Sequence, residues 1–385
     1  MLAAARRGRL LVAALAAAGS LAITSPARAD FATCLNGLRS EALAHGITDA
    51  SFAAFALNLQ PNDAPKFLGA QPEFDIPVWD YLGGLVDDQR VSEGLAQMRL
   101  HSRALSLAQQ RFGVDRFIIA ALWGVESDYG RKFGKRPVLA SLASLSCAAG
   151  RRRSYFRTEF IAALRILQNG QVRPDRFYGS WAGAFGITQF MPTTFFRSAV
   201  DMDGDGRADI VDSTADALGS TANYLRQHGW RPGEPWGFEV RLPRAYKGPV
   251  GMRTRRTMAF WRSHGLRRVN GAALGMGVAA LILPAGRAGP AFLVTPNFDA
   301  LVSYNEAQSY GLAIGLLADR LRGGPPLRTP WPNGERGLSR IERRELQTLL
   351  KECGYQVGRI DGVLGAKSRA AMADIQVKLK MAPNG

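Results

Sequence analysis

Apolar residues recur at spacings of three and four along most of the chain between residues 30 and 322. This spacing places them on one face of an α-helix. Short loops between such segments predict a mainly α, helical core. The clearest runs are FATCLNGLRSEALAHGI (31–47), VSEGLAQMRLHSRALSLAQQRFGV (91–114), YFRTEFIAALRILQNG (155–170) and TADALGSTANYLRQHGW (214–230).

The stretch 233–295 has a different pattern, because Pro and Gly are scattered among short β-prone runs such as GFEVRLP and AFLVTP. It predicts a small strand-containing elaboration. Residues 323–336 are rich in Pro and Gly, which is typical of a semi-stiff linker. A second, small helical module follows in residues 337–385. Its own pattern fits a docking or dimerisation unit as well as a binding domain.

The first 29 residues have the features of a cleavable signal peptide. Arg6, Arg7 and Arg9 precede an apolar stretch, and Ala27-Arg28-Ala29 forms a small-x-small cleavage site. The alternative, a membrane anchor, is disfavoured because the apolar stretch 10–23 is short for a bilayer span. We expect a periplasmic protein that is not a lipoprotein, since the residue directly after the cleavage site is Asp30 and not a cysteine. Arg6-Arg7 leaves twin-arginine export open.

Charge narrows the choice of partner. The net charge is +17, and the first 29 residues hold four arginines and no acid, so the remaining chain carries +17 less 4, or +13. A basic chain outside the cytoplasm is suited to an anionic polymer of the cell envelope, and we expect no nucleic acid partner. The three cysteines are Cys34, Cys147 and Cys353. Export favours pairing, and Cys34 with Cys147 is our hypothesis because both lie in the main domain.

Glu126 lies where ionisation of its carboxyl group is unfavourable. In AALWGVESDYGRKFGKRP, Glu126 follows the apolar run 117–125. Asp115 is the expected N-cap and Gly130 the expected stop of this helix. In the last turn, the helix dipole and the apolar neighbours both oppose ionisation of Glu126. A carboxyl group that keeps its proton near neutral pH is suited to general acid catalysis. An ordinary exposed Glu is the alternative for this helix considered alone.

The segment GSWAGAFGITQFMPTTFF (179–196) surrounds the amide of Gln189 with glycines and aromatic residues. Trp181, Phe185 and Phe190 could form a flat apolar wall for sugar rings, although tight helix packing is the alternative. The four histidines lie far apart, and no nucleophile elbow, phosphate loop or Cys-x-x-Cys pair is present. Histidine-based triads are therefore disfavoured.

The segment DMDGDGRADIVD (201–212) has the spacing of an EF-hand calcium loop. The expected ligands are Asp201, Asp203, Asp205, Arg207 and Asp212. An Asp at the twelfth position is shorter than the usual Glu. Because all ligands are oxygens, we expect a structural Ca²⁺ that braces the loop and no cofactor for catalysis.

Together these segments resemble the membrane-bound lytic murein transglycosylase B family, which cleaves peptidoglycan. WGVESDYGRKFGK resembles its catalytic helix, GSWAGAFGITQFMP its second signature and SYNEAQSYGLAIGLLADRL its last one. The metal loop lies between the last two. CGYQVGRIDGVLGAKSRAAM (353–372) resembles a peptidoglycan-binding module of the three-helix kind. The chain departs from the family in having no lipoprotein cysteine and in stopping at KMAPNG, so the module can be incomplete.

The resemblance implies a lysozyme-like helical catalytic domain over residues 30–322 and makes Glu126 the catalytic acid. It implies contacts to the sugar chain from Ser180, Gln189, Tyr304, Asn305 and Tyr310, and by a looser match from Tyr81, Arg151 and Arg152. The implied partners are peptidoglycan glycan strands, with cell-wall enzyme complexes as a further possibility, and the chain is expected to be a monomer.

The implied reaction needs one carboxylate, because the substrate's own C6 hydroxyl replaces water and closes a 1,6-anhydro ring. Glu126 would act first as acid and then as base. Asp128 is a poor second carboxylate, since residues two apart on a helix do not share a face. Two alternatives stay open at this stage: a hydrolytic muramidase, and a non-catalytic wall-binding scaffold.

Overall fold

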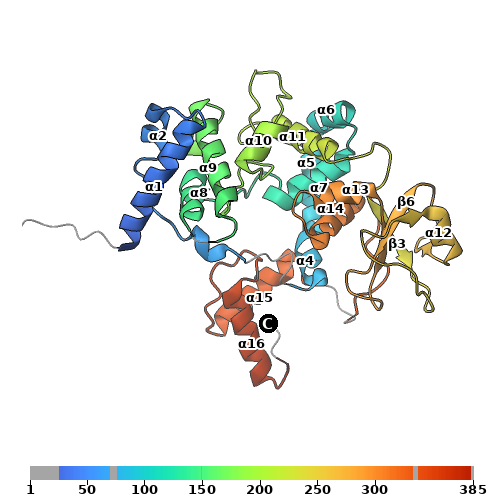
Figure 1. The fold of residues 1–385 in the computed structure, drawn as a ribbon. Helices are drawn as coiled ribbons and strands as arrows, with labels where there is room; N and C mark the ends of the chain where they lie inside the picture. The colour runs from blue at the N-terminus through green and yellow to red at the C-terminus, as the bar shows by residue number, and fades with distance from the viewer. Residues whose placement is uncertain (1–25, 70–75, 149, 333–336, 383–385) are drawn as a thin grey trace, which may run out of the picture.

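The structure, a computed structural model, describes residues 26–69, 76–148, 150–332 and 337–382. It is mainly helical, which confirms the predicted fold class (Figure 1). The helices are α1 (Pro26–Ala44), α2 (Asp49–Phe55), α4 (Val78–Leu85), α5 (Asp88–Leu100), α6 (Ser102–Phe112), α7 (Arg116–Ser127), α8 (Val138–Cys147), α9 (Arg153–Gln168), α10 (Pro192–Ser198), α11 (Thr214–Gln227), α12 (Met258–Ser263), α13 (Pro296–Val302), α14 (Gln308–Leu321), α15 (Arg340–Glu352) and α16 (Ala366–Lys378), with short 3-10 helices η1 (Ala64–Phe67) and η2 (Pro174–Arg176).

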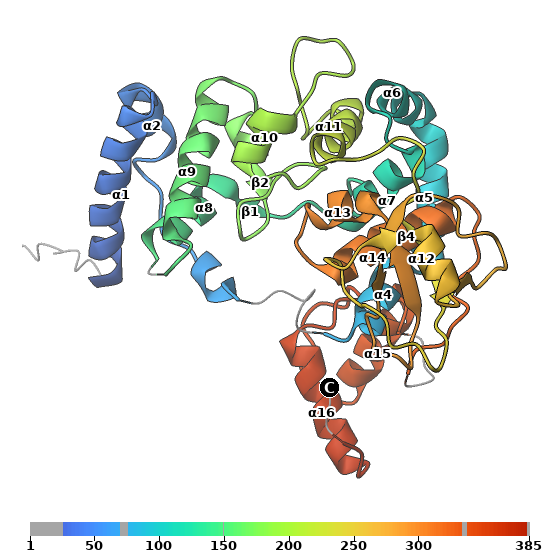
Figure 2. The ribbon, with the colours of Figure 1, turned by 45° about the vertical axis from the view of Figure 1, so that its right-hand side comes forward.

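The part of the chain from α1 to α14 contains two groups of helices, which α10 joins. One group holds α1, α2, α8 and α9, and the other holds α5, α6, α7, α11, α13 and α14 (Figures 1 and 2). Within the second group α14 packs along α7 and α11 packs along α6. One hydrophobic cluster runs through both groups. Burial of this shared apolar surface is the main force that holds them together.

The long apolar run 91–114 forms two helices instead of one. The backbone leaves helical geometry at His101 (φ −106°, ψ 27°), whose ring meets Trp123 edge-on with the ring centroids 5.2 Å apart. The break allows both α5 and α6 to contact α7. Gly113, with φ 70°, then ends α6 in the left-handed conformation that glycine favours. The helix that carries Glu126 is therefore packed on two sides.

The expected strand-containing elaboration is present as a five-stranded antiparallel sheet in the order β4-β6-β7-β3-β5. GFEVRLP supplies β3 and AFLVTP supplies β7, which pair with Gly237 opposite Val294. Trp261 is fully buried at the centre of this unit's own core. The strands are β3 (Gly237–Arg241), β4 (Arg256–Thr257), β5 (Arg267–Arg268), β6 (Val278–Ile282) and β7 (Ala291–Val294), and a separate short pair joins β1 (Arg136–Pro137) to β2 (Tyr178–Gly179).

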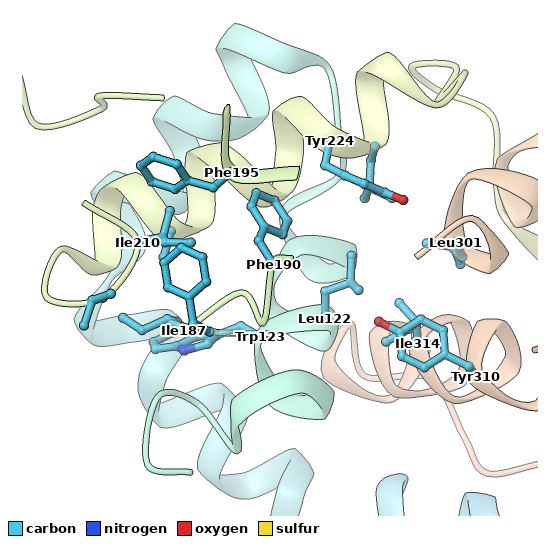
Figure 3. Packing of buried hydrophobic residues seen from close by; sticks show 14 of the residues in the cluster. Leu122, Trp123, Ile187, Phe190, Phe195, Ile210, Tyr224, Leu301, Tyr310 and Ile314 are labelled. Carbon is cyan, nitrogen blue, oxygen red and sulfur yellow. The ribbon is translucent and has the colours of Figure 1, made fainter. Parts of the chain in front are cut away.

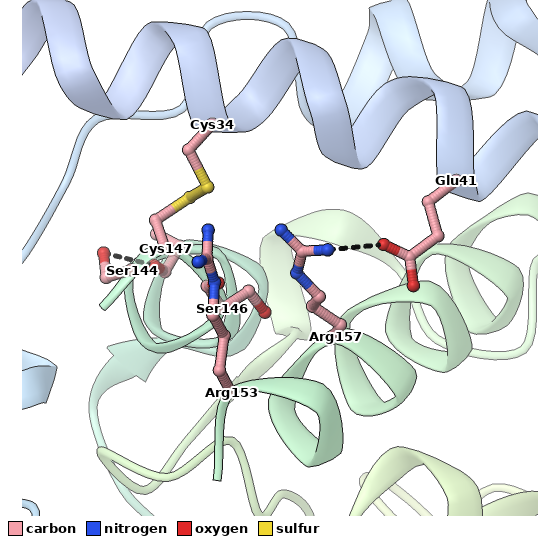
Figure 4. The surroundings of a disulfide bond; sticks show 8 residues. Cys34, Glu41, Ser144, Ser146, Cys147, Arg153 and Arg157 are labelled. Atoms are coloured by element: carbon pink, nitrogen blue, oxygen red, sulfur yellow. Dashed lines mark hydrogen bonds and ion pairs between the residues drawn. A yellow bond between two sulfur atoms is a disulfide. The ribbon is translucent and has the colours of Figure 1, made fainter. Parts of the chain in front are cut away.

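A disulfide joins Cys34 of α1 to Cys147 of α8, while Cys353 is exposed and lies outside any disulfide (Figure 4). The bond closes a segment of 113 residues. An ion pair between Arg157 and Glu41, 3.2 Å long, ties α9 to the same helix. The first helix is therefore fixed to both α8 and α9.

The segment 323–332, which composition predicts to be part of a semi-stiff linker, is docked on the rest of the protein. The carboxylate of Glu239 accepts hydrogen bonds from the backbone N–H groups of Arg328 (3.0 Å) and Thr329 (2.8 Å). Trp331 packs against Trp79 of α4, with ring centroids 6.3 Å apart. Leu327 also packs on the main core. The apolar residues among the prolines thus dock this part of the linker, which composition alone could not show.

The predicted signal peptide falls mainly outside the described residues, which begin at Pro26, the first residue of α1. Within the part of the chain that is described, no helix combines the length and the apolar character that a bilayer span requires. The C-terminal module contains α15 and α16 around a small core of Leu350, Val357 and Ala371. It lies beside α4 in both views of the ribbon (Figures 1 and 2).

Candidate active site

Helix α7 places Glu126 in its last turn. Asp115 is the N-cap, as expected, and accepts a hydrogen bond from the N–H of Phe117 at 2.8 Å. The helix ends at Ser127, earlier than the predicted stop at Gly130. Asp128 (φ 53°), Tyr129 (φ 58°) and Gly130 (φ 80°) are all left-handed. Two non-glycine residues in this conformation are strained, and such strain persists only where surrounding contacts enforce it.

Glu126 is half-buried and faces a narrow hollow with mostly apolar walls. The hollow is lined by Leu122, Trp123, Ile187, Thr188, Ala217, Leu218 and Thr221. Within the described chain, Nε1 of Trp123 and Oγ1 of Thr188 are buried without a hydrogen-bond partner. Because an unpaired buried polar atom is costly, these two atoms mark a place beside Glu126 where the described chain leaves hydrogen-bonding capacity unused.

Two stacked tyrosines form one wall beside Glu126. The hydroxyl of Tyr310 donates a hydrogen bond to Oε1 of Glu126, and Figure 3 shows this side chain of α14 turned toward α7. Tyr304 lies parallel to Tyr310, with ring centroids 6.2 Å apart, and donates to the carbonyl of Thr188 at 2.7 Å. Burial, followed by the charge of Glu126, raises the pKa of both tyrosines well above the ordinary value. Both hydroxyls therefore keep their protons and act as donors.

The loop after β2 supplies the opposite wall. Gln189 has φ 52°, and its Nε2 donates to the carbonyls of Phe133 and Gly186, each at 2.9 Å. Oγ of Ser180 accepts the N–H groups of Ala182 (3.3 Å) and Ala184 (3.1 Å), which shapes the start of the loop. In the described structure Gln189 and Ser180 thus position backbone.

The apolar sugar-binding wall predicted for this loop is wrong in two of its three members. Phe185 is fully buried and Phe190 is 2% exposed, so both belong to the core. Figure 3 shows Phe190 among the packed side chains. Their apolar area is taken up by packing with Phe177, Phe195 and Tyr224. Trp181 alone is half-buried and able to present a face to a ligand.

The remaining predicted substrate residues divide into two sets. Tyr81 is buried in α4 and acts electrostatically on Tyr310, and Asn305 follows Tyr304 in a turn. Arg151 and Arg152 are exposed at the start of α9, where Arg152 lies over the rings of Tyr155 and Phe156 at 5.2 and 5.3 Å. The structure thus places Tyr81 near Tyr310 and Asn305 next to Tyr304, and it places the arginines on a different helix group.

The predicted metal loop brings together four carboxylates: Asp201, Asp203, Asp205 and Asp216, with oxygens all within 4.8 Å of one another. Asp212, the predicted twelfth ligand, instead forms an ion pair with Arg176. Asp216 takes its place because Ser213 caps α11 and turns the first turn of that helix toward the loop. Four close carboxylates repel one another unless a cation lies between them, and an all-oxygen donor set suits Ca²⁺.

Sequence reasoning missed a buried ionic cluster at the C-terminal end of α7. Arg340 of α15 contacts Asp128 (2.7 Å), Glu93 (2.9 Å) and Asp87 (3.0 Å). Arg90 also approaches Asp128, at 3.7 Å. Although Asp128 lies two residues from Glu126, its carboxylate is therefore engaged away from the site. The sequence gives no signal for a contact that joins residues more than 200 positions apart.

Comparison with known proteins agrees with this geometry. Residues 30–319 match the family model of the Transglycosylase SLT domain, and residues 339–385 match a peptidoglycan binding domain model. The chain is 30% identical over 283 residues to membrane-bound lytic murein transglycosylase B of Escherichia coli strain K12, which covers 73% of this chain and 78% of that protein.

Two solved structures are similar. SltB3 from Pseudomonas aeruginosa, in complex with NAG-anhNAM-pentapeptide, shares 43% identity and a TM-score of 0.75, covering 92% of this chain and 96% of the other. The Escherichia coli lytic transglycosylase Slt35, in complex with calcium, shares 28% identity and a TM-score of 0.66, covering 77% and 93%. Because the family model matches most of the chain and the relatives share its length, the chain belongs to the lytic transglycosylase family and is an enzyme of peptidoglycan cleavage.

Proposed function

We propose that Glu126 is the single acid and base of a reaction that cleaves the MurNAc-β-1,4-GlcNAc bond and leaves a 1,6-anhydroMurNAc end. The observation that carries this proposal is the pairing of Glu126 with the Tyr310 hydroxyl at the edge of the hollow. The NAG-anhNAM-pentapeptide bound to SltB3 is a molecule with such an end.

The reaction then needs two proton movements. Protonated Glu126 gives its proton to the glycosidic oxygen, the C1–O bond breaks, and the bonding electron pair leaves with GlcNAc. Positive charge develops on the MurNAc ring, whose C6 hydroxyl attacks C1. The Glu126 carboxylate removes the C6 proton as the new bond forms, which restores the acid. Tyr310 holds the carboxylate in orientation throughout.

One carboxylate is sufficient because no water has to be activated. A hydrolytic glycosidase places a second carboxylate across the bond as base or nucleophile. Here Asp128 is bound to arginines, and Asp115 forms an ion pair with Arg322 at 2.5 Å. Neither is placed for that role.

The acidic loop would hold a structural Ca²⁺ through Asp201, Asp203, Asp205 and Asp216, with Arg207 offering its backbone carbonyl. The cation would fix the loop 201–212 to α11. The chemistry proposed for Glu126 does not involve it.

We further propose that the protein acts on glycan strands in the periplasm after removal of residues 1–29, and that residues 337–385 bind peptidoglycan. The support is the sequence pattern of the first residues and the match of 339–385 to a binding domain. We place the domain boundaries at 322/323 and 336/337, which lie between the end of α14 at Leu321 and the start of α15 at Arg340.

Product analysis tests the reaction directly. Purified sacculi are digested with the full chain, and the released muropeptides are weighed and separated by reversed-phase chromatography. Anhydro ends are expected. Products heavier by one water, with reducing muramic ends, would make the enzyme a muramidase, and an absence of released fragments would favour a wall-binding scaffold.

A further inference from the structure

The C-terminal module is joined to the catalytic part by buried charge. Arg340, the first residue of α15, is 8% exposed, and Asp87 and Asp128, which it contacts, are 7% and 8% exposed. With Glu93, Arg90, Arg131 and Lys132 they form a cluster of three carboxylates, three guanidinium groups and one ammonium group. Inside a protein a buried charge is costly unless it is paired. Loss of Arg340 would remove the ion pair of the buried Asp87 carboxylate and the shortest ion pair of Asp128.

The cluster includes the end of the catalytic helix. The N–H of Asp128 caps the carbonyl of Gly124 at 3.1 Å, and the same carbonyl accepts a hydrogen bond from Arg90. Tyr129 packs so closely on Gly124 that a Cβ there would lie 2.7 Å from its ring. Glu126 therefore lies between two fixed points, Gly124 and Asp128, and the second is held by Arg340.

Asp87 connects α5 to α15 directly. Asp87 caps α5, accepting the N–H of Arg90 at 2.7 Å, and its other oxygen accepts Nε of Arg340 at 3.0 Å. Ser339 and Glu342 form a capping box that fixes the start of α15. One carboxylate thus joins the first turns of two helices.

A second set of contacts reaches α4, the helix of Tyr81. Arg343 is 9% exposed and donates a hydrogen bond to the carbonyl of Asp80. The two backbones also touch: a Cβ on Gly83 would lie 2.6 Å from Gly337, and one on Gly337 would lie 2.1 Å from the carbonyl oxygen of Trp79. Only glycines allow this approach. The module is therefore docked at two places.

We propose that Arg340 is a positioning residue for the Glu126 carboxylate, so that the C-terminal module is part of the active-site scaffold as well as a wall-binding unit. Arg340 forms the shortest ion pair of Asp128, at 2.7 Å, and so helps to hold the strained left-handed turn that ends α7. Arg90, Arg131 and Lys132 also contact Asp128, so loss of Arg340 would shift this carboxylate and loosen the last turn without leaving the charge unpaired. This inference rests on the proposed role of Glu126.

The test uses the full chain and soluble peptidoglycan oligosaccharides, whose cleavage does not require attachment to a sacculus. Arg340→Met removes the charge and keeps the side-chain length. Lys351→Met is the matched control, since Lys351 is an exposed cation at the other end of α15. We expect Arg340→Met to lose roughly tenfold to a hundredfold in kcat, with KM nearly unchanged, as misplacement of a catalytic group predicts. The control should equal the parent.

Two further variants separate positioning from simple support. Arg340→Lys keeps the charge but cannot reach three carboxylates, so its kcat should lie between those of parent and Arg340→Met. In an Asp128→Asn background, Arg340→Met should change kcat much less than it does in the parent, because Arg340 acts through the Asp128 carboxylate. Should Arg340→Met fail to fold, the same cycle with Arg340→Lys carries the test.

Parent-like kcat in folded Arg340→Met or Arg340→Lys, or an equal loss of kcat on removing Arg340 in the parent and in the Asp128→Asn background, would overturn the inference. These results differ from a failure of the proposed function, which would show as full activity in Glu126→Gln. If Glu126→Gln is inactive while the Arg340 variants turn over normally, only the positioning role fails.

Discussion

The hydroxyl of Tyr310 in α14 donates a hydrogen bond to the carboxylate of Glu126 in α7, across 184 positions of sequence. The donor keeps its proton because burial and the adjacent charge raise its pKa. A fixed donor gives the carboxylate one orientation, which suits a group that must give and then take a proton at neighbouring sugar oxygens.

Replacing Tyr310 with Phe should lower kcat by roughly tenfold to a hundredfold, because a carboxylate without its orienting donor is misplaced for both proton transfers. The ring stays and keeps its stacking on Tyr304, so the variant should fold, with a stability lower by about 1.5–3 kcal/mol for the lost hydrogen bond to a charged group. Steady-state kinetics on soluble glycan fragments measure the effect. Tyr246→Phe is the control, since it removes a hydroxyl that bonds Pro249 at 2.9 Å inside the sheet unit. Equal activity of both variants would contradict the role of Tyr310.

Calcium should raise the melting temperature, and chelator should lower it. At a free concentration about a hundredfold above Kd, the gain in unfolding free energy is about 2.7 kcal/mol. Asp216→Asn should remove this dependence, whereas Asp212→Asn should keep it, because Asp212 is paired with Arg176 outside the cluster. Thermal melts with and without calcium decide between the two residues. If only Asp212→Asn lost the calcium effect, Asp212 and not Asp216 would be the ligand, as the spacing of the loop predicts.

Breaking the disulfide should destabilise the chain. A cross-link that closes a loop of about a hundred residues stabilises a fold by about 2–5 kcal/mol, mainly through the unfolded state. The double variant Cys34→Ser with Cys147→Ser should therefore melt at a lower temperature yet turn over normally below its transition. Cys353→Ser, at an exposed thiol, should melt like the parent. A double variant as stable as the parent would show that α1 is held by packing alone.

The ionisation of Asp319 should weaken the fold as pH rises. Burial raises the pKa of this carboxyl to about 6, although Trp236 and Arg322 act in the other direction. The ordinary value is 3.8, so the folded state binds more protons between these two pH values, and stability is lost as pH rises through about 6.

Asp319→Asn cannot ionise and still offers an oxygen to Nε1 of Trp236. Relative to the parent, it should therefore gain stability above about pH 6 and show no such gain near pH 4. Urea unfolding at the two pH values measures the difference. A change of the same size at both would mean that ionisation of Asp319 does not contribute.

Local patterns predicted much of the fold. The spacing of apolar residues located α9 and α11, and β-prone runs located β3 and β7. The break at His101 escaped prediction because it depends on a contact with Trp123 in another helix. The docked linker escaped for the same reason, since Trp331 needs Trp79 as a partner.

Some residues of the site were also predictable from the sequence, and others were not. Glu126 and its helix cap follow from residues near one another in sequence, and the resemblance pointed to Tyr304 and Tyr310, which the structure places beside Glu126. Asp216 lies beyond the loop that carries the metal pattern and reaches it only because α11 turns there. Arg340 joins the site through tertiary packing alone. Contacts between distant segments carry no periodic signal, so only the folded chain reveals them.

The most direct measurement of the central claim is the rate at which Glu126→Gln releases anhydromuropeptides from sacculi. The amide keeps the shape of the side chain but has no proton to give, so the rate should fall roughly a hundredfold to ten-thousandfold while the melting temperature stays that of the parent. A folded Glu126→Gln that releases anhydro ends as fast as the parent would contradict the assignment of Glu126 as the acid and base.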